Sequence, residues 1–120
     1  MSSCYDLLDE TEDRYLIDCP GDTIKEIFWL VDGSESDKPV PSILSQWEYY
    51  GFGPEEPEPI HLEAAQVAAD LKALIAVFLK LKPDRRFGVL TALEWIDTFT
   101  DALNYISEHP KSTFRSKFFE

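Results

Sequence analysis

The most regular alternation of apolar and polar positions lies in the second half of the chain. Between Glu63 and Leu81 apolar residues recur every three or four positions, which predicts an amphipathic helix that ends before Pro83. The same period predicts a longer helix over residues 86–108, which is stopped by Pro110. Two consecutive helices joined by a short turn should pack antiparallel, so we expect this pair to supply most of the core.

The first half of the chain predicts shorter elements. Residues 4–8 and 14–19 are β-compatible runs separated by the acidic stretch 9–13, a pattern typical of a hairpin. A helix is predicted over residues 22–33, because its start has the spacing of a capping box and its apolar residues recur at helical intervals. A second short helix is predicted over residues 41–51.

The remaining segments connect or close these elements. Residues 51–59 are rich in Gly and Pro, which predicts an extended linker. Residues 60–62 suit a short strand, which Pro59 restricts to a sheet edge or a bridge. Residues 112–119 mix aromatic and basic side chains, and they either fold back over the core or pair with the acidic half as a strand.

The predicted fold is therefore a single α+β domain over residues 1–120 that is mainly helical. It consists of a small N-terminal β-hairpin, two short helices and a long antiparallel helix pair. The hydrophobic fraction of 44% is enough to build a packed core, so the chain is not a disordered acidic tail.

The charge is divided unevenly along the chain. The formal net charge is −12, and residues 1–63 hold 16 acids and 3 bases, whereas residues 64–120 hold 7 acids and 8 bases. A field of one sign attracts partners of the opposite sign, although acidity also simply favours solubility. Direct nucleic-acid binding is not expected, because the clustered Lys and Arg that neutralise phosphates are few.

The sequence also bears on compartment and redox state. No secretory signal is visible at the N-terminus, and the longest apolar stretch, Ala73–Leu79, is too short to span a bilayer, so we expect a cytoplasmic protein without membrane contact. Cys4 and Cys19 lack CxxC spacing, which favours two free thiols in a reducing compartment. The predicted hairpin leaves a disulfide between them open, because they could face each other across its strands.

No pattern of catalytic residues stands out. The chain has no GxSxG, Walker, HExxH or GxGxxG motif. His61 is interpreted as a packed or capping histidine, and His109 lies at a predicted helix C-terminus, where a cation is favourable. We therefore predict no enzymatic activity, no cofactor and no metal site.

Two acidic segments are candidates for partner binding. In the first, aromatic anchors run into an acidic proline loop, and its residues are Trp47, Glu48, Tyr49, Tyr50, Phe52, Glu55, Glu56 and Glu58. The second is the turn of the predicted hairpin, with Asp9, Glu10, Glu12 and Asp13. The alternatives are that Trp47 and Tyr50 belong to the core and that both acidic segments are ordinary solvated loops. Both segments lie outside the predicted helix pair, so we expect their acidity to be separable from folding.

One family resemblance bears on these predictions. The order of residues 27–33, 41–44, 59–62 and 65–71 resembles the YfbM-like bacterial proteins, which are small proteins of poorly defined function. The similarity covers about residues 22–75, and the chain lacks the Trp and His that the family usually has early in the first helix. The resemblance implies an α+β domain without catalytic residues, and a housekeeping domain that forms a homodimer or larger homo-oligomer is the alternative function.

The leading functional prediction is a non-enzymatic protein that binds a basic partner protein. In its general style the chain resembles immunity proteins, which are short, acidic bacterial proteins with exposed aromatic residues that neutralise basic nuclease toxins. In such a complex charge would mainly raise the association rate and the specificity, while aromatic anchors would hold the partner. The acidic half of this chain and its aromatic segment both suit that role.

Overall fold

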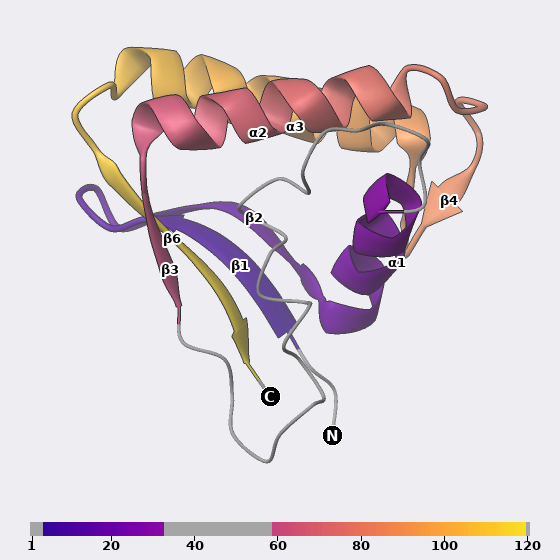
Figure 1. Ribbon diagram of the computed structural model, residues 1–120, viewed down its shortest axis with the longest axis horizontal. Helices are drawn as coiled ribbons and strands as arrows, with labels where there is room; N and C mark the ends of the chain where they lie inside the picture. Colours follow the sequence, from indigo (N-terminus) through magenta and orange to yellow (C-terminus); the bar gives the residue numbers. More distant parts are fainter. Residues whose placement is uncertain (1–3, 33–58, 120) are drawn as a thin grey trace.

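A computed structural model describes residues 4–32 and 59–119 of the chain, and the described part is an α+β fold (Figure 1). The order of its elements is β1 (Cys4–Asp9), β2 (Arg14–Pro20), α1 (Gly21–Asp32), β3 (Ile60–Glu63), α2 (Ala64–Phe78), β4 (Arg86–Phe87), β5 (Leu90–Thr91), α3 (Ala92–Glu108) and β6 (Thr113–Phe119). The helix predicted over residues 41–51 and nearly all of the predicted linker lie outside the described residues.

The four longest described strands form one antiparallel sheet in the order β2-β1-β6-β3. The predicted hairpin is confirmed as β1 and β2, and β3 is an edge strand. The strand β6 lies in the middle of the sheet between β1 and β3. Its Phe114 is paired with Asp9 of β1 on one side and with Leu62 of β3 on the other. Of the two alternatives for the last segment, pairing with the acidic half as a strand is therefore confirmed.

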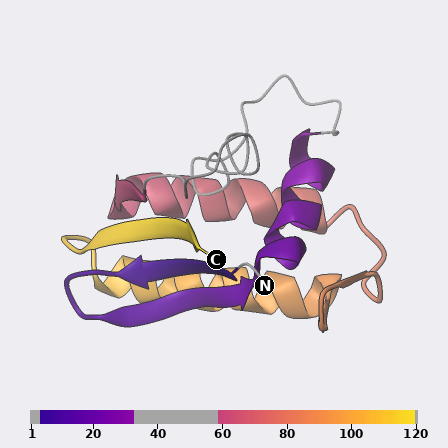
Figure 2. The same ribbon diagram turned by 90° about the horizontal axis from the view of Figure 1, so that it is seen from below.

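The helices α2 and α3 pack antiparallel across one face of the sheet, as Figures 1 and 2 show. The core between the layers takes alternate residues from the strands and one stripe from each helix. Phe78 of α2 meets the ring of Phe99 of α3 edge to face at 5.2 Å. The predicted helix pair is thus confirmed, but a four-stranded sheet shares the core with it, so "mainly helical" describes the fold only roughly.

The start of α3 differs from the prediction. The helix begins at Ala92 rather than at residue 86, because residues 86–91 form the small β4–β5 hairpin instead. Gly88 makes its turn at φ +65°, and a Cβ there would lie 2.5 Å from Thr23 Oγ1. Thr91 then begins α3 with a capping box, in which its Oγ1 accepts a hydrogen bond from the backbone N–H of Glu94 at 3.2 Å.

The two cysteines are free thiols in this fold. Cys19 is opposite Tyr5, and Cys4 is opposite Pro20, so the two cysteine side chains point to opposite faces of the sheet. Burial raises the pKa of the Cys19 thiol to about 12, which makes it a poor nucleophile. In the part of the chain that the structure describes, no helix is long and apolar enough to cross a membrane.

Candidate protein-binding surface

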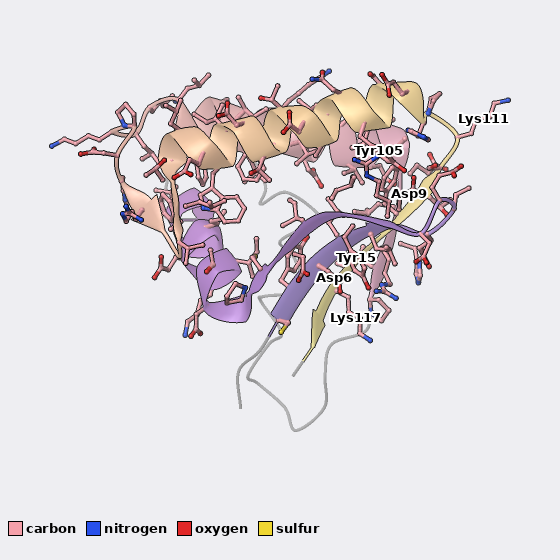
Figure 3. The ribbon with its side chains drawn as sticks, turned by 180° about the vertical axis from the view of Figure 1, so that it is seen from behind. Asp6, Asp9, Tyr15, Tyr105, Lys111 and Lys117 are labelled. Carbon is pink, nitrogen blue, oxygen red and sulfur yellow. The ribbon has the colours of Figure 1, made fainter. Side chains whose placement is uncertain are left out.

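The turn of the β1–β2 hairpin is built around the buried carboxylate of Asp9, the last residue of β1. Its Oδ1 accepts hydrogen bonds from the backbone N–H groups of Thr11 at 2.9 Å and Glu12 at 3.2 Å. Its Oδ2 accepts the hydroxyl of Tyr105, on α3, at 2.6 Å. One carboxylate therefore shapes the turn and attaches it to the helix layer (Figure 3).

The hydrogen bonds around Asp9 and Tyr105 decide which of the two side chains is charged. Burial alone would raise the pKa of Asp9, but hydrogen bonds from Tyr105, the backbone of Glu12, Ser112 and the backbone of Thr11 outweigh it and lower the pKa. Burial, followed by the hydrogen bond and the charge of Asp9, raises the pKa of Tyr105 to about 12. At neutral pH the carboxylate is therefore ionised and the phenol is a neutral donor.

Further contacts fasten the segment of residues 10–13, which we call the hairpin tip. The backbone N–H of Glu10 donates to the carbonyl of Thr113 at 2.9 Å, and the N–H of Thr113 donates to Thr11 Oγ1 at 3.2 Å. The ring of His109 stacks on Tyr105, the partner of Asp9, with 4.0 Å between centroids. After the tip, the Arg14 guanidinium lies over the ring of Tyr105, 4.8 Å from its centroid. Contacts to β6 and α3 thus flank the tip, which lowers the cost of ordering its backbone on binding.

The predicted site residues divide into three groups. Glu10, Glu12 and Asp13 are exposed on the hairpin tip, and Glu10 Oε1 also bonds His61 Nδ1 at 2.7 Å. Asp9 is fully buried and is used internally, so its carboxylate is not available to a partner and its acidity is not separable from folding. The residues of the aromatic segment, Trp47, Glu48, Tyr49, Tyr50, Phe52, Glu55, Glu56 and Glu58, lie outside the described residues.

The sheet face turned away from the helices holds a second buried carboxylate, Asp6. It is 2% exposed, and its Oδ1 accepts a hydrogen bond from Arg115 Nη2 at 3.3 Å. Desolvation raises the pKa of Asp6, since it outweighs the hydrogen bond and the charge of Arg115. In Figure 3 Asp6 lies along β1 from Asp9, near Tyr15 and Lys117.

Sequence reasoning did not single out Asp6, and it missed Tyr105 and Arg115 as the hydrogen-bond partners of Asp9 and Asp6. A signal for the turn was present, because an Asp that precedes a turn commonly accepts backbone N–H groups two and three residues later. The partner on α3 follows from tertiary packing, which brings together residues 96 positions apart.

The described residues contain no group of three or more His, Cys, Asp or Glu side chains placed to hold a metal ion. What the hairpin offers chemically is a group of exposed carboxylates on a held backbone, which can form ion pairs with Lys and Arg.

Comparisons of the chain with protein-family models, with curated proteins and with solved structures gave no match. A proposal for its function therefore rests on the charge and geometry of the chain itself.

Proposed function

We propose that this chain is a non-enzymatic, cytoplasmic protein that binds a basic partner protein through the acidic β1–β2 hairpin. An inhibitor of the immunity-protein kind, which covers the basic surface of a toxin such as a nuclease, is the form of this function that suits the charge best. The observation that carries the proposal is the hairpin tip, which exposes Glu10, Glu12 and Asp13 on a backbone held by hydrogen bonds.

The fastening of the tip supports this function energetically. Ordering a side chain on binding costs roughly 0.5–1.5 kcal/mol, and a flexible loop adds the cost of ordering its backbone. Here Asp9 and Thr113 already hold the backbone of the tip. A partner that presents Lys or Arg would therefore have to order the acidic side chains of the tip but not its backbone.

The charge of the N-terminal half supports fast association with such a partner. Although Asp6 and Asp9 are buried, other acids of the same half are exposed, namely Glu10, Glu12, Asp13, Asp18, Asp22, Glu26 and Glu63. Complementary fields of this kind raise association rates and reject partners of the same sign. The aromatic segment from Trp47 to Phe52 is part of the proposal as the anchor that slows dissociation.

The proposal is tested by capture of partners from a lysate of the native host, followed by binding measurements with the purified partner. Three baits are compared: the wild-type chain, the tip variant E10K/E12K and the control variant D97K/D101K. Both variants shift the net charge by four units, and the control positions are exposed on α3. We expect the wild type and the control to retain the same basic protein at low salt, and the tip variant to lose it.

High salt should weaken this complex, since exposed charges are screened. A Trp47→Ala bait should release the partner faster without slowing its association. If no basic protein binds at any salt concentration, or if the tip variant binds the partner as tightly as the control does, the proposal fails.

A further inference from the structure

The connection between α2 and α3, residues 79–91, is basic although the chain as a whole is acidic. Its four bases are all exposed, and they are Lys80, Lys82, Arg85 and Arg86. Asp84 is the one acid in this segment. Figures 1 and 2 both place the connection at the opposite end of the molecule from the hairpin tip.

Backbone hydrogen bonds give the connection a defined shape. The N–H of Ala92 donates to the carbonyl of Arg85 at 2.7 Å, and the N–H of Leu93 donates to the carbonyl of Pro83 at 3.2 Å. Trp95 Nε1 donates to the carbonyl of Phe87 at 2.9 Å, which holds the β4–β5 hairpin against the core. The turn of that hairpin therefore presents Val89 to solvent from a fixed base.

Exposed apolar side chains are concentrated at the connection end of the molecule. Among the described residues, the large hydrophobic side chains that are exposed are Leu79, Val89, Leu93 and Tyr15. Leu79, Val89 and Leu93 belong to the connection and the first turn of α3, and Val89 is 82% exposed. Tyr15 follows the hairpin tip on β2 and is 55% exposed. The connection thus combines an excess of bases with exposed apolar surface, whereas the hairpin tip carries an excess of acids with one exposed tyrosine after it.

We propose that the α2–α3 connection is a docking site for the hairpin tip of a second copy of this chain, so that copies associate head to tail. In this contact Glu10 and Glu12 of one copy face Lys82 and Arg86 of the next, and Tyr15 lies over Val89. The contact joins two different surfaces, so it is heterologous and it builds short chains or a ring rather than a two-fold dimer.

The expected affinity is low. Two narrow surfaces of this kind bury less than the 1,200–2,000 Å² or so of a stable interface, so we expect a dissociation constant on the order of 0.1–1 mM. The net charge of −12 on each copy opposes association. This repulsion is screened beyond about 8 Å in roughly 0.15 M salt, whereas the local contact acts at shorter range.

Self-association would use the same tip as the proposed basic partner, so the partner would compete with it. The two ideas nevertheless stand apart, because association between copies is measured on the pure chain and partner binding is measured with the partner present. Failure of one leaves the other untouched.

The test is sedimentation equilibrium of the full chain at concentrations up to about 1 mM in roughly 0.15 M salt. Four variants accompany the wild type: E10K/E12K, K82E/R86E, the combination of all four substitutions, and the control D97K/D101K. E10K/E12K and the control lower the net negative charge equally, so general repulsion falls by the same amount in both. A loss of association in E10K/E12K alone therefore reports the tip.

We expect the average mass of the wild type and the control to rise with concentration from 13.8 kDa. The double variants E10K/E12K and K82E/R86E should each stay monomeric. Association should return in the variant with all four substitutions, because its two ends are complementary again. It should also return in an equimolar mixture of E10K/E12K and K82E/R86E, for the same reason. V89S, at an exposed position, should weaken association without unfolding the chain. A wild type that stays at the monomer mass throughout, or a variant with all four substitutions that does not recover association, overturns the proposal.

Discussion

Asp6 and Asp9 lie three residues apart on β1, and both are buried, yet their surroundings act on them in opposite directions. On the helix side of the sheet, Asp9 receives enough hydrogen bonds to lower its pKa. On the other side, Asp6 has Arg115, and desolvation raises its pKa. Burial therefore does not by itself decide whether a carboxylate stabilises this fold, because the number of donors that replace water decides it.

The largest expected effect comes from removing the charge of Asp9, with the same change at Asp6 as the comparison. Asp9→Asn should lower the free energy of unfolding by about 2–4 kcal/mol, because the charge that strengthens these hydrogen bonds is lost and an NH2 group replaces one of the two acceptor oxygens. Asp6→Asn should stay within about 1 kcal/mol of the wild type, since relief of charge burial offsets the weaker bond to Arg115. Urea unfolding measures both, and equal losses for the two variants would remove the distinction.

A smaller effect is expected when the donor is removed instead. Tyr105→Phe should lower the free energy of unfolding by about 1–2 kcal/mol, because Asp9 loses a buried hydrogen bond but keeps those of the turn. The exposed Tyr15→Phe is the matched control and should change it little. In a double-mutant cycle, Tyr105→Phe should lower the free energy of unfolding much less when Asp9 is already replaced by Asn. Additive losses would show that the two side chains act independently.

The dependence of stability on pH should separate the two carboxylates further. The pKa of Asp9 is lowered in the folded state from 3.8, so its contribution is full above pH 3.8 and is lost as the pH falls through the folded-state pKa. The pKa of Asp6 is raised above 3.8 on folding, so its protonation favours the folded state as the pH falls through that raised value.

Unfolding free energies measured between about pH 2 and pH 7 test this sign. Asp9→Asn should flatten the loss of stability at acid pH, whereas Asp6→Asn should make the loss steeper because the opposing contribution is gone. If Asp6→Asn also flattened the loss, Asp6 would be stabilised as an anion, contrary to its desolvated position.

The smallest effect is expected at Glu10, the exposed neighbour of Asp9. Its bond to His61 joins two solvated side chains, so Glu10→Gln should change the free energy of unfolding by roughly 0–1 kcal/mol. The same urea experiment measures it. A loss as large as that of Asp9→Asn would mean that the hairpin tip, too, is needed for folding.

Local pattern was sufficient for the elements whose partners are near in sequence. The β1–β2 hairpin and α2 follow from alternation and helical spacing. The start of α3 was wrong because helical periodicity was extended through Gly88 and past the capping box at Thr91. The central place of β6 in the sheet was one of two open alternatives, since strand order depends on packing between distant segments.

The candidate site was predictable to the same extent. Charge patterning found the acids of the hairpin tip, but it did not separate the exposed Glu12 from the buried Asp9. That difference depends on the hydrogen bond from Tyr105 to Asp9 and on the backbone hydrogen bond from Glu10 to Thr113. Both partners lie about a hundred residues further along the chain.

The division between a structural Asp9 and a desolvated Asp6 is tested most directly by an NMR titration of the side-chain carboxyl carbons in the folded wild-type chain. We expect the pKa of Asp9 to lie below 3.8 and that of Asp6 to lie above it. If the two carboxyls titrate together, or if Asp9 has the higher pKa, then Asp9 is not the ionised acceptor that fastens the hairpin tip.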